Sequence, residues 1–350
     1  MKDLAATLAG FPRERLTRLP TPLHSLPTLG AQLGVDLWIK RDDLTDLALG
    51  GDKPRKLEYE IAAARAAGAD TLVTCGSAQS NHARLTAAAA RQRGLHCTVI
   101  LSDDEWRAIQ GNLLTVFLFG AEVVIVEAED HWDLEQYALD RCAEIDAAGG
   151  RAHYIPVSGT TPLSCLGYVG AGLEIADQFA EHELSPAAVY APFGTGGVFT
   201  GTLLALRERG IDCPVIGISV NRDQKTCEAN LDHWWAALCQ LLARSPVPRR
   251  EPYELHDGYV GRHYGDPTEA TLDAILTMGE AEGLLLDPVY SGKMTAGFLD
   301  HCAGGRWINS GKTIVLIHTG GVPALFAYHE VIEDHLRARG RLADLPKLGT

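Results

Sequence analysis

The sequence lacks the excess of positive charge that a polyanion-binding protein needs. Its 350 residues hold 31 Lys and Arg against 45 Asp and Glu, which gives a formal net charge of -14. Nucleic acids and anionic membranes are bound by concentrated Lys and Arg side chains. We therefore expect no nucleic-acid partner and no membrane partner, and any anion-binding site must be local.

Long hydrophobic runs and paired cysteine motifs are also missing. The opening stretch MKDLAATLAGFPRERL (residues 1–16) has charged residues inside its short apolar segments, and no later run approaches the length of a membrane span. We expect a cytoplasmic protein. The absence of a CxxC pair favours reduced, buried thiols and no metal site. The cysteines are Cys75, Cys97, Cys142, Cys165, Cys213, Cys227, Cys239 and Cys302.

Two common nucleotide-binding signatures are absent. The stretch APFGTGGVFTG (191–201) follows an apolar run and precedes a helix-like segment, but its spacing differs from the dinucleotide fingerprint and it contains no GK[ST]. A hydride-transfer site and a P-loop are therefore unsupported. The small residues would let backbone N–H groups surround an anion at a helix N-terminus, although a plain tight turn explains this stretch equally well when it is taken alone.

Short β-branched runs alternate with longer Ala- and Leu-rich stretches along most of the chain. The alternation predicts parallel sheets covered by helices on both faces, that is, an α/β protein with a boundary near 155–165. Strands are predicted at 70–76, 96–102, 122–128, 152–158, 187–194, 213–220 and 312–321. The least regular stretch, 241–267, is predicted to cross the surface in extended form.

Polar side chains follow several of these runs. CGSAQSNHARL (75–85) offers Gln79, Ser80, Asn81 and His82 where a helix should begin. One of them could simply cap the helix, but four exceed what a cap requires. Ligands of open α/β sheets bind at the carboxyl ends of the strands, so these groups could hold a substrate carboxylate and a cofactor hydroxyl. LLLDPVYSGK (284–293) and IHTGGVPAL (317–325) predict similar turns.

The stretch GGDKPRKLEYE (50–60) combines backbone freedom with positive charge. Lys53 and Lys56 lie three residues apart, so on a helix both amines share one face. A solvated cluster is the simpler interpretation of either lysine alone. Together with the glycine-rich turn and the SNH turn, the pair predicts pyridoxal 5'-phosphate (PLP) held as a Schiff base, one amine on its carbonyl carbon and the other on its phosphate.

These motifs, in this order, resemble the D-cysteine desulfhydrase and 1-aminocyclopropane-1-carboxylate deaminase family of fold type II PLP enzymes. The resemblance covers almost the whole chain. It implies a two-domain α/β architecture of parallel-rich sheets flanked by helices, with PLP in the interdomain cleft, and a homodimer. The larger, PLP-binding domain would be formed by 1–52 and 160–350, and the smaller inserted domain by 53–159.

The resemblance also implies a role for each matching residue. Lys53 would form the Schiff base and later move the α-proton. The phosphate would be held by Lys56, Gly194, Thr195, Gly196, Gly197 and Val198. Asn81 would bind the 3'-oxygen, Ser291 would face the pyridine nitrogen, and Thr319 would complete that end. The small amino-acid substrate would meet Ser80, Asn81, His82, Tyr264 and Tyr290, of which Ser80, Tyr264 and Tyr290 are the catalytic candidates beside Lys53.

Two positions favour β-elimination. The deaminases that the sequence resembles carry Glu and Leu where this chain has Ser291 and Thr319, the desulfhydrase pattern. A carboxylate at the pyridine nitrogen would strengthen the electron sink, which opening an unactivated ring should need. We therefore expect PLP-dependent β-elimination from a small β-substituted amino acid, D-cysteine above all, to pyruvate, ammonia and hydrogen sulfide.

Several departures keep alternatives open. The usual GGNKTRK is GGDKPRK here, so Asp52 lies beside Lys53 and Pro54 removes a backbone donor. Arg262 and His263 flank Tyr264 and, within the cleft, would suit a sulfonate leaving group. The alternatives are an L-cysteate sulfo-lyase releasing sulfite, a 1-aminocyclopropane-1-carboxylate deaminase, and a degenerate homologue that binds PLP or an amino acid without turnover.

Overall fold

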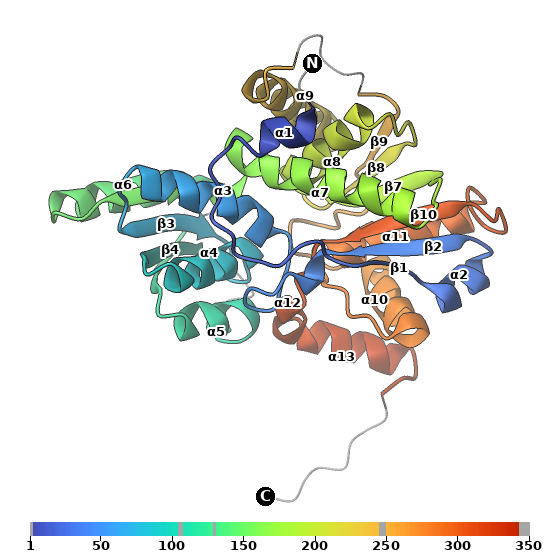
Figure 1. Cartoon of the computed structure of the whole chain (residues 1–350). Coiled ribbons are helices and arrows are strands. Elements are labelled where there is room, and N and C mark those ends of the chain that lie inside the picture. The colour runs from blue at the N-terminus through green and yellow to red at the C-terminus, as the bar shows by residue number, and fades with distance from the viewer. Residues whose placement is uncertain (1–2, 104–107, 129–130, 245–249, 343–350) are drawn as a thin grey trace, which may run out of the picture.

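A computed structural model describes residues 3–103, 108–128, 131–244 and 250–342. Figure 1 shows two twisted sheets side by side, with helices on both faces of each. The larger sheet has the strand order β1-β2-β10-β7-β8-β9, and the smaller has the order β5-β4-β3-β6. All neighbouring strands are parallel except β1 and β2. The predicted α/β class with parallel-rich sheets is confirmed.

The strand bounds match the sequence pattern closely. The larger sheet consists of β1 (Leu23–Ser25), β2 (Asp36–Arg41), β7 (Ala188–Phe193), β8 (Val215–Ser219), β9 (Tyr253–His256) and β10 (Thr313–His318). The smaller consists of β3 (Thr71–Gly76), β4 (His96–Ser102), β5 (Glu122–Val126) and β6 (Ala152–Ile155). The seven predicted strands are therefore confirmed, as β3 to β8 and β10. The stretch 241–267 was predicted to cross the surface in extended form, but residues 253–256 join the larger sheet as β9, and residues 245–249 lie outside the described residues. Strands β1 and β2 were not predicted.

Helices follow most strands. They are α1 (Leu4–Leu8), α2 (Pro27–Leu33), α3 (Lys53–Ala66), α4 (Asn81–Gln92), α5 (Gly111–Leu118), α6 (Glu135–Ala147), α7 (Pro162–Glu181), α8 (Gly197–Glu208), α9 (Gln224–Leu241), α10 (Glu269–Glu282), α11 (Ser291–Ala303), α12 (Pro323–Ala327) and α13 (His329–Ala338). Short 3-10 turns are η1 (Asp42–Leu44), η2 (His131–Leu134) and η3 (Val157–Gly159). None of the helices in the described residues is long and apolar enough to cross a membrane.

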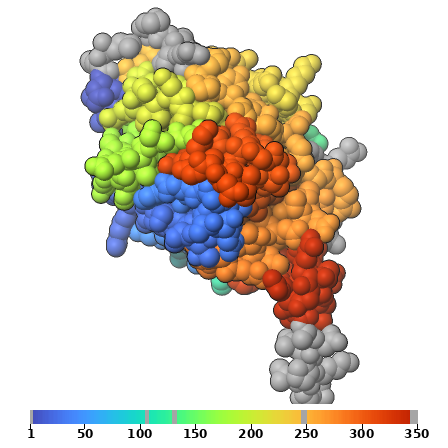
Figure 2. All heavy atoms as spheres, turned by 90° about the vertical axis from the view of Figure 1, so that its right-hand side faces the viewer, coloured from blue at the N-terminus to red at the C-terminus, as the bar shows by residue number. Residues whose placement is uncertain are grey.

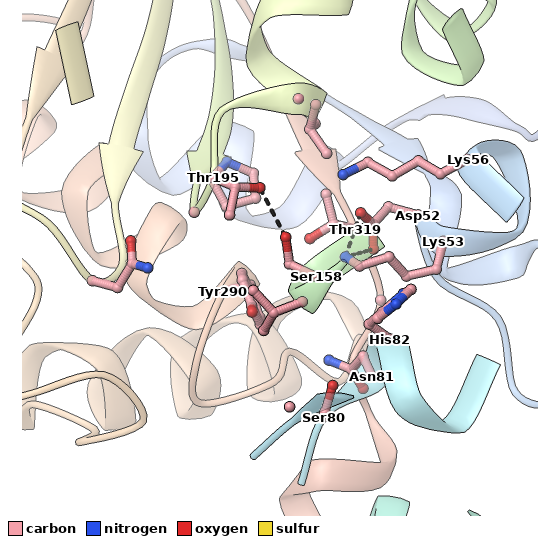
Figure 3. A pocket seen from close by; sticks show the side chains of 18 of the residues that line it. Asp52, Lys53, Lys56, Ser80, Asn81, His82, Ser158, Thr195, Tyr290 and Thr319 are labelled. Atoms are coloured by element: carbon pink, nitrogen blue, oxygen red, sulfur yellow. Dashed lines mark hydrogen bonds and ion pairs between the residues drawn. The ribbon is translucent and has the colours of Figure 1, made fainter. Parts of the chain in front are cut away.

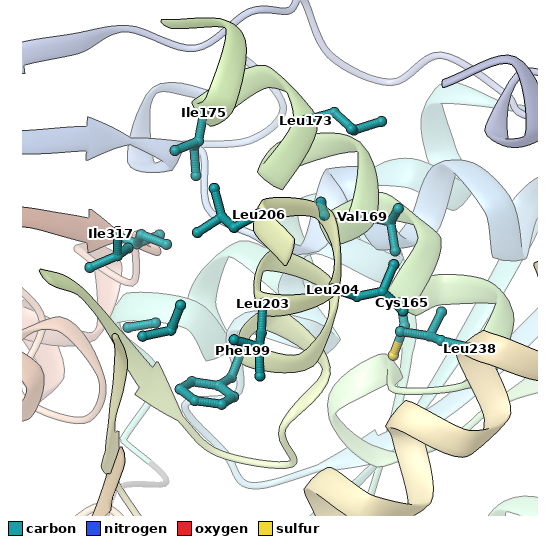
Figure 4. Close-up of a cluster of buried hydrophobic side chains, with 14 of the residues drawn as sticks. Cys165, Val169, Leu173, Ile175, Phe199, Leu203, Leu204, Leu206, Leu238 and Ile317 are labelled. Atoms are coloured by element: carbon teal, nitrogen blue, oxygen red, sulfur yellow. The ribbon is translucent and has the colours of Figure 1, made fainter. Parts of the chain in front are cut away.

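Alternate residues of the central strand β10 enter two separate cores. Val315 and Ile317 join the cluster around α7, α8 and α9, whereas Ile314 and Leu316 join the cluster on the other face. This division follows from the two-residue period of a strand, and it explains why a strand covered on both faces is apolar throughout. Figure 4 shows the first cluster, where side chains of α7 and α8 pack over the sheet.

The two ends of the larger sheet differ. At the amino ends of the strands, α2, the stretch 305–312 and the chain before β7 lie side by side (Figure 2). Backbone hydrogen bonds close this face, among them the bonds from Asn309 N to Leu33 O at 2.8 Å and from Gly311 N to Gly34 O at 2.8 Å. The polar turns singled out in the sequence lie at the carboxyl ends, where parallel sheets bind their ligands.

The cysteines lie mainly in hydrophobic cores, as do Trp235 and Trp307. All eight cysteines are free, and all are buried except Cys142 and Cys213, which are partly buried. The predicted reduced thiols are confirmed. Trp235 packs in the core as expected, whereas the neighbouring Trp234 also donates a hydrogen bond of 2.7 Å from Nε1 to Thr195 O in the glycine-rich turn.

Candidate active site

One cleft collects the predicted site residues, with walls from both sheets. The side of the smaller sheet contributes the turn after β3 and the start of α4, and the larger sheet contributes the turns after β7, β8 and β10. All predicted site residues except Ser291 line it, namely Lys53, Lys56, Ser80, Asn81, His82, Gly194, Thr195, Gly196, Gly197, Val198, Tyr264, Tyr290 and Thr319.

The loop before α3 explains the glycine pair next to the lysine. Residues 48–51 have consecutive positive φ values of 45°, 68°, 70° and 130°. A Cβ on Gly50 would lie 1.8 Å from Asp43 O, so only glycine fits there. Arg84 of α4, buried beneath the loop, donates to Ala48 O and, at 3.0 Å, to Gly50 O. Arg84, from the helix that follows β3 of the smaller sheet, thus fixes the loop conformation that presents Lys53.

Lys53 begins α3 and reaches into the cleft (Figure 3). Its Nζ donates to both carboxylate oxygens of Asp52, at 2.8 and 2.7 Å, and lies 5.8 Å from the ring centre of Tyr290. Pro54 occupies the first turn of α3, where its missing N–H is not needed. Lys53 and Lys56 are 7% and 2% exposed, so the alternative of a solvated lysine cluster is wrong.

Lys56 faces a cluster of three hydroxyl groups. Its Nζ donates to Thr160 Oγ1 at 3.0 Å, which lies 2.6 Å from Thr195 Oγ1. Ser158 Oγ lies 3.0 Å from the Thr195 hydroxyl and 3.2 Å from that of Thr160. Burial and the nearby Lys53 ammonium lower the pKa of Lys56 to about 8. A bound dianion would supply the missing counter-charge, so the cluster fits a phosphate.

The glycine-rich turn completes this cradle. Gly196 has φ +96°, and α8 begins at Gly197. A Cβ on Gly197 would lie 3.2 Å from Lys56 Nζ and 3.0 Å from Thr160 Cγ2, so a side chain would occupy the space beside the ammonium. The N–H groups at the start of α8 remain directed at this space, as in other anion sites at helix N-termini.

The turn after β3 caps α4 and also presents a side-chain amide to the cleft. Ser80 Oγ accepts a 3.1 Å hydrogen bond from Ala83 N, so Ser80 is the N-cap of α4 and also lines the cleft. Asn81 Oδ1 accepts from Asn112 Nδ2 at 2.9 Å and from Arg84 at 3.5 Å. These bonds orient the amide so that its NH₂ group points toward the cleft (Figure 3). A donor suits the cofactor's 3'-oxygen.

His82 turns its ring away from a substrate. Its Nε2 lies 2.8 Å from Thr74 Oγ1, and its Nδ1 lies 3.4 Å from Thr86 Oγ1. Complete burial and the ammonium groups of Lys53 and Lys56 hold its pKa well below 6.5, so the ring is neutral. Its contribution to the cleft is therefore confined to the wall and backbone of the turn.

Two tyrosines from separate segments share a hydrogen bond in the cleft. The hydroxyl oxygens of Tyr264 and Tyr290 lie 2.7 Å apart. Burial, with the neighbouring Tyr264 hydroxyl, raises the pKa of Tyr290 well above 10. Tyr290 therefore keeps its proton at neutral pH and can donate it beside Lys53.

Ser291 is the predicted site residue that does not reach the cleft wall. It is fully buried, and its Oγ donates to Asp287 Oδ1 at 2.6 Å while accepting from Asp287 N at 2.9 Å. Contact with a pyridine nitrogen stays a prediction, and it would require Ser291 to exchange one of these bonds. Thr319, in contrast, lines the cleft, and its carbonyl accepts from Asp52 N at 3.0 Å.

Several residues of the cleft were not predicted. Ser158 and Thr160 belong to the hydroxyl cluster, and Ser77 and Asn221 line the walls. Among the described residues, the buried Oδ1 of Asn221 has no hydrogen-bond partner. The serine and threonines of PVSGTT (156–161) were the available signal, because small hydroxyl residues between a strand and a helix often bind anions.

Arg262 and His263 lie outside the cleft. The Arg262 side chain is 79% exposed and donates to Asp266 at 2.7 Å, and the exposed His263 has Nδ1 3.0 Å from Tyr264 O. Neither residue is among those that line the cleft. They do not provide the sulfonate partners that the sequence left open.

Comparisons with known proteins agree with this arrangement. The family described as pyridoxal-phosphate dependent enzyme matches residues 15–320. The D-cysteine desulfhydrase of Serratia proteamaculans (strain 568) is 40% identical over 332 residues, which cover 93% of this chain and 99% of that protein. The D-cysteine desulfhydrase of Salmonella choleraesuis (strain SC-B67) is 40% identical over 330 residues, covering 92% and 98%.

Solved structures share the fold. A crystal structure described as an ACC deaminase homologue superposes with a TM-score of 0.88 at 35% identity, covering 96% of this chain and all of that one. A fungal L-serine ammonia-lyase from Rhizomucor miehei superposes with a TM-score of 0.66 at 18% identity over 91% and 98% of the two chains, which shows the fold alone. Matches of this extent in both sequence and structure place the chain in the family of pyridoxal-phosphate-dependent enzymes, with the fold type II architecture.

Proposed function

We propose that the protein is a D-cysteine desulfhydrase that converts D-cysteine and water to pyruvate, ammonia and hydrogen sulfide. The observation that carries this proposal is the partly buried Tyr264–Tyr290 pair beside Lys53, with hydroxyl oxygens 2.7 Å apart. Elimination of sulfide needs a base at the α-carbon and a proton for the departing sulfur. The names and the 40% identity of the two bacterial relatives support the same reaction.

The residues of the cleft fit PLP at each end. Lys56 with Thr160 and Thr195 would hold the phosphate, the NH₂ of Asn81 would hold the 3'-oxygen, and Lys53 would carry the cofactor covalently. When bound there, PLP supplies the electron sink that stabilises negative charge at the α-carbon of an amino acid. Thr319 and Ser291 are neutral side chains at the positions that the resemblance assigns to the pyridine end of the cofactor, and Ser291 Oγ donates to the buried Asp287 carboxylate at 2.6 Å.

Residues of the chain would bind the substrate carboxylate and transfer the protons. The substrate carboxylate would bind the turn at Ser80 and Asn81, which fixes the α-carbon near Lys53. The Lys53 amine, once free, would take the α-proton. The resulting ammonium would be stabilised by the Asp52 carboxylate, with which Lys53 forms an ion pair at 2.7 Å. Tyr290, kept protonated by burial, would donate to the sulfur as the carbon–sulfur bond breaks, and Tyr264 would share the proton.

Ring-opening deamination is the second candidate. It is supported by the 35% identity to the solved relative described as an ACC deaminase homologue. The desulfhydrase is preferred because this cleft holds the neutral Thr319 and has no carboxylate other than Asp52 among the described residues that line it. Release of sulfite from L-cysteate is disfavoured because Arg262 and His263 lie outside the cleft.

Substrate choice is tested by product formation in the PLP-loaded enzyme. We expect D-cysteine and β-chloro-D-alanine to give pyruvate, and 1-aminocyclopropane-1-carboxylate to give little 2-oxobutyrate. Efficient ring opening would instead select the deaminase, and sulfite from L-cysteate in excess of sulfide from D-cysteine would select the sulfo-lyase. No turnover of any of the four, with PLP bound, would indicate a degenerate homologue.

Lys56→Ala is expected to weaken PLP binding by roughly ten- to a hundredfold, because a charge-assisted hydrogen bond to phosphate is lost. The borohydride-reducible linkage to Lys53 should survive at saturating PLP. Titration of the apo-protein with PLP measures the change. The exposed Lys312 provides the matched control, since Lys312→Ala should bind PLP as the unchanged protein does. Equal affinities for both variants would remove Lys56 from the phosphate site.

The family resemblance leads us to propose three further properties. The enzyme acts in the cytoplasm as a homodimer, and its domains divide at residues 52/53 and 159/160. Analytical ultracentrifugation would test the dimer. Amide hydrogen exchange in increasing denaturant would test the domain limits, because residues of one cooperative unit should exchange together.

A further inference from the structure

Lys293 is a fully buried lysine that lies behind the tyrosine pair rather than in the cleft. It belongs to the first turn of α11 and has no exposed surface. Burying an ammonium group is costly unless it is hydrogen bonded, so its partners have to be accounted for. Nζ donates to Val260 O at 2.6 Å and to Val220 O at 3.5 Å.

These carbonyls belong to segments that line the cleft. Val260 lies in the connection from β9 to α10, four residues before Tyr264. Val220 follows β8 and directly precedes the cleft residue Asn221. Lys293 itself lies three residues after Tyr290. One ammonium group therefore joins the two chain segments that carry the paired tyrosines.

Two carboxylates complete the surroundings of the ammonium. Asp287 is fully buried and accepts from the N–H groups of Val289, Tyr290 and Ser291 at 2.7 to 2.9 Å, so it fixes the turn that carries Tyr290. Asp266 accepts from Arg262 N at 2.9 Å and so closes the turn around Tyr264. Burial lowers the pKa of Lys293 to about 8, and both carboxylates oppose this effect. The ammonium form therefore persists at neutral pH.

We propose that Lys293 is a positioning residue that holds the Tyr264 and Tyr290 segments together, so that the two hydroxyls meet in the cleft. Without the Lys293 ammonium, the Val260 carbonyl loses this donor, and the segment that carries Tyr264 loses this link to α11. A small displacement of a proton donor lowers the rate of the chemical step more than it lowers substrate binding. This inference rests on the proposed function of the tyrosine pair.

The test replaces Lys293 by methionine, which keeps most of the buried volume and removes the ammonium. We expect kcat for D-cysteine to fall on the order of tenfold or more, with a smaller change in KM and with PLP retention unchanged. Amide hydrogen exchange in residues 257–267 should become faster, a change that does not depend on activity. Lys293→Gln keeps a hydrogen-bond donor without the charge, so its kcat should lie between those of the unchanged enzyme and Lys293→Met. It also provides a second variant if methionine prevents folding.

Chemical rescue separates the charge from the packing. Lys293→Ala should recover part of its kcat with millimolar propylammonium, whereas Lys293→Met should not, because its side chain fills the space. Wild-type kcat in Lys293→Met, while Tyr290→Phe loses turnover, would overturn the positioning role and leave the proposed function intact. Wild-type kcat in Tyr290→Phe would overturn both. Slower turnover of Lys293→Met with unchanged exchange in 257–267 would also contradict the proposal.

Discussion

Lys53→Ala is expected to reduce turnover to background and to abolish the borohydride-reducible linkage between protein and PLP. Lys53 is the lysine that lies beside Tyr290, and its removal would take away both the proposed covalent attachment and the proposed base for the α-proton. Absorbance of the PLP-loaded protein in the visible region, before and after borohydride, measures the linkage. Pyruvate formation from D-cysteine measures turnover.

Lys56→Ala is the matched control for this variant, because both lysines belong to α3 and line the same cleft. Its visible band should persist at saturating PLP. Loss of the band in Lys56→Ala and its persistence in Lys53→Ala would reverse the two assignments. Non-covalent PLP should still bind to Lys53→Ala, since the hydroxyl cluster around Thr160 is untouched.

The strands were predictable because their side chains face two cores. In β3, Leu72 packs on one face and Val73 on the other, so the run is apolar without interruption. The strands that were missed lie toward the edges of the larger sheet. β1 has three residues, and β9 has the burial pattern of a strand covered on one side. Residues 253–256 form a strand because they pair with β8, and the local sequence pattern does not predict such pairing.

The charged helix α3 shows a second limit of sequence reasoning. Its first residues suggest a solvated face, yet the structure buries them, and the side chains of Arg55 and Lys56 meet partners from distant segments. Arg55 is 1% exposed and binds Asp42 and Glu174, which lie 13 positions before and 119 positions after it. Such pairs are set by tertiary structure, so local spacing indicated only that Lys53 and Lys56 share a face.

The candidate site was largely predictable because its residues gather in short motifs at strand ends. The contacts of Ser291 and Thr160, in contrast, could not be predicted from the motifs. Ser291 satisfies Asp287 at the start of α11, and that bond depends on where the helix begins. Thr160 reaches Lys56 across 104 positions of sequence, so only the packing of α3 near η3 brings the two together.

Removal of one hydroxyl from the tyrosine pair is expected to affect substrates unequally. Tyr290→Phe should lower kcat for D-cysteine on the order of a hundredfold or more, the usual scale for a lost general acid. The loss with β-chloro-D-alanine should be much smaller, because chloride leaves without a proton whereas sulfide leaves more readily with one. Steady-state pyruvate formation from both substrates measures this difference, and an unchanged visible band would show that PLP is still bound.

Tyr137→Phe provides the control, since Tyr137 lies on α6 with 46% of its surface exposed and is not among the residues that line the cleft. It should leave both rates near those of the unchanged enzyme. An equal loss on both substrates in Tyr290→Phe would place the hydroxyl in a step that the two reactions share, such as transfer of the α-proton, and would remove it as the acid for sulfur. Unchanged rates would reduce Tyr290 to a packing residue. The unequal loss is expected because Tyr290 is protonated and hydrogen bonded to Tyr264, so under the proposed function its proton would be available to the departing sulfur.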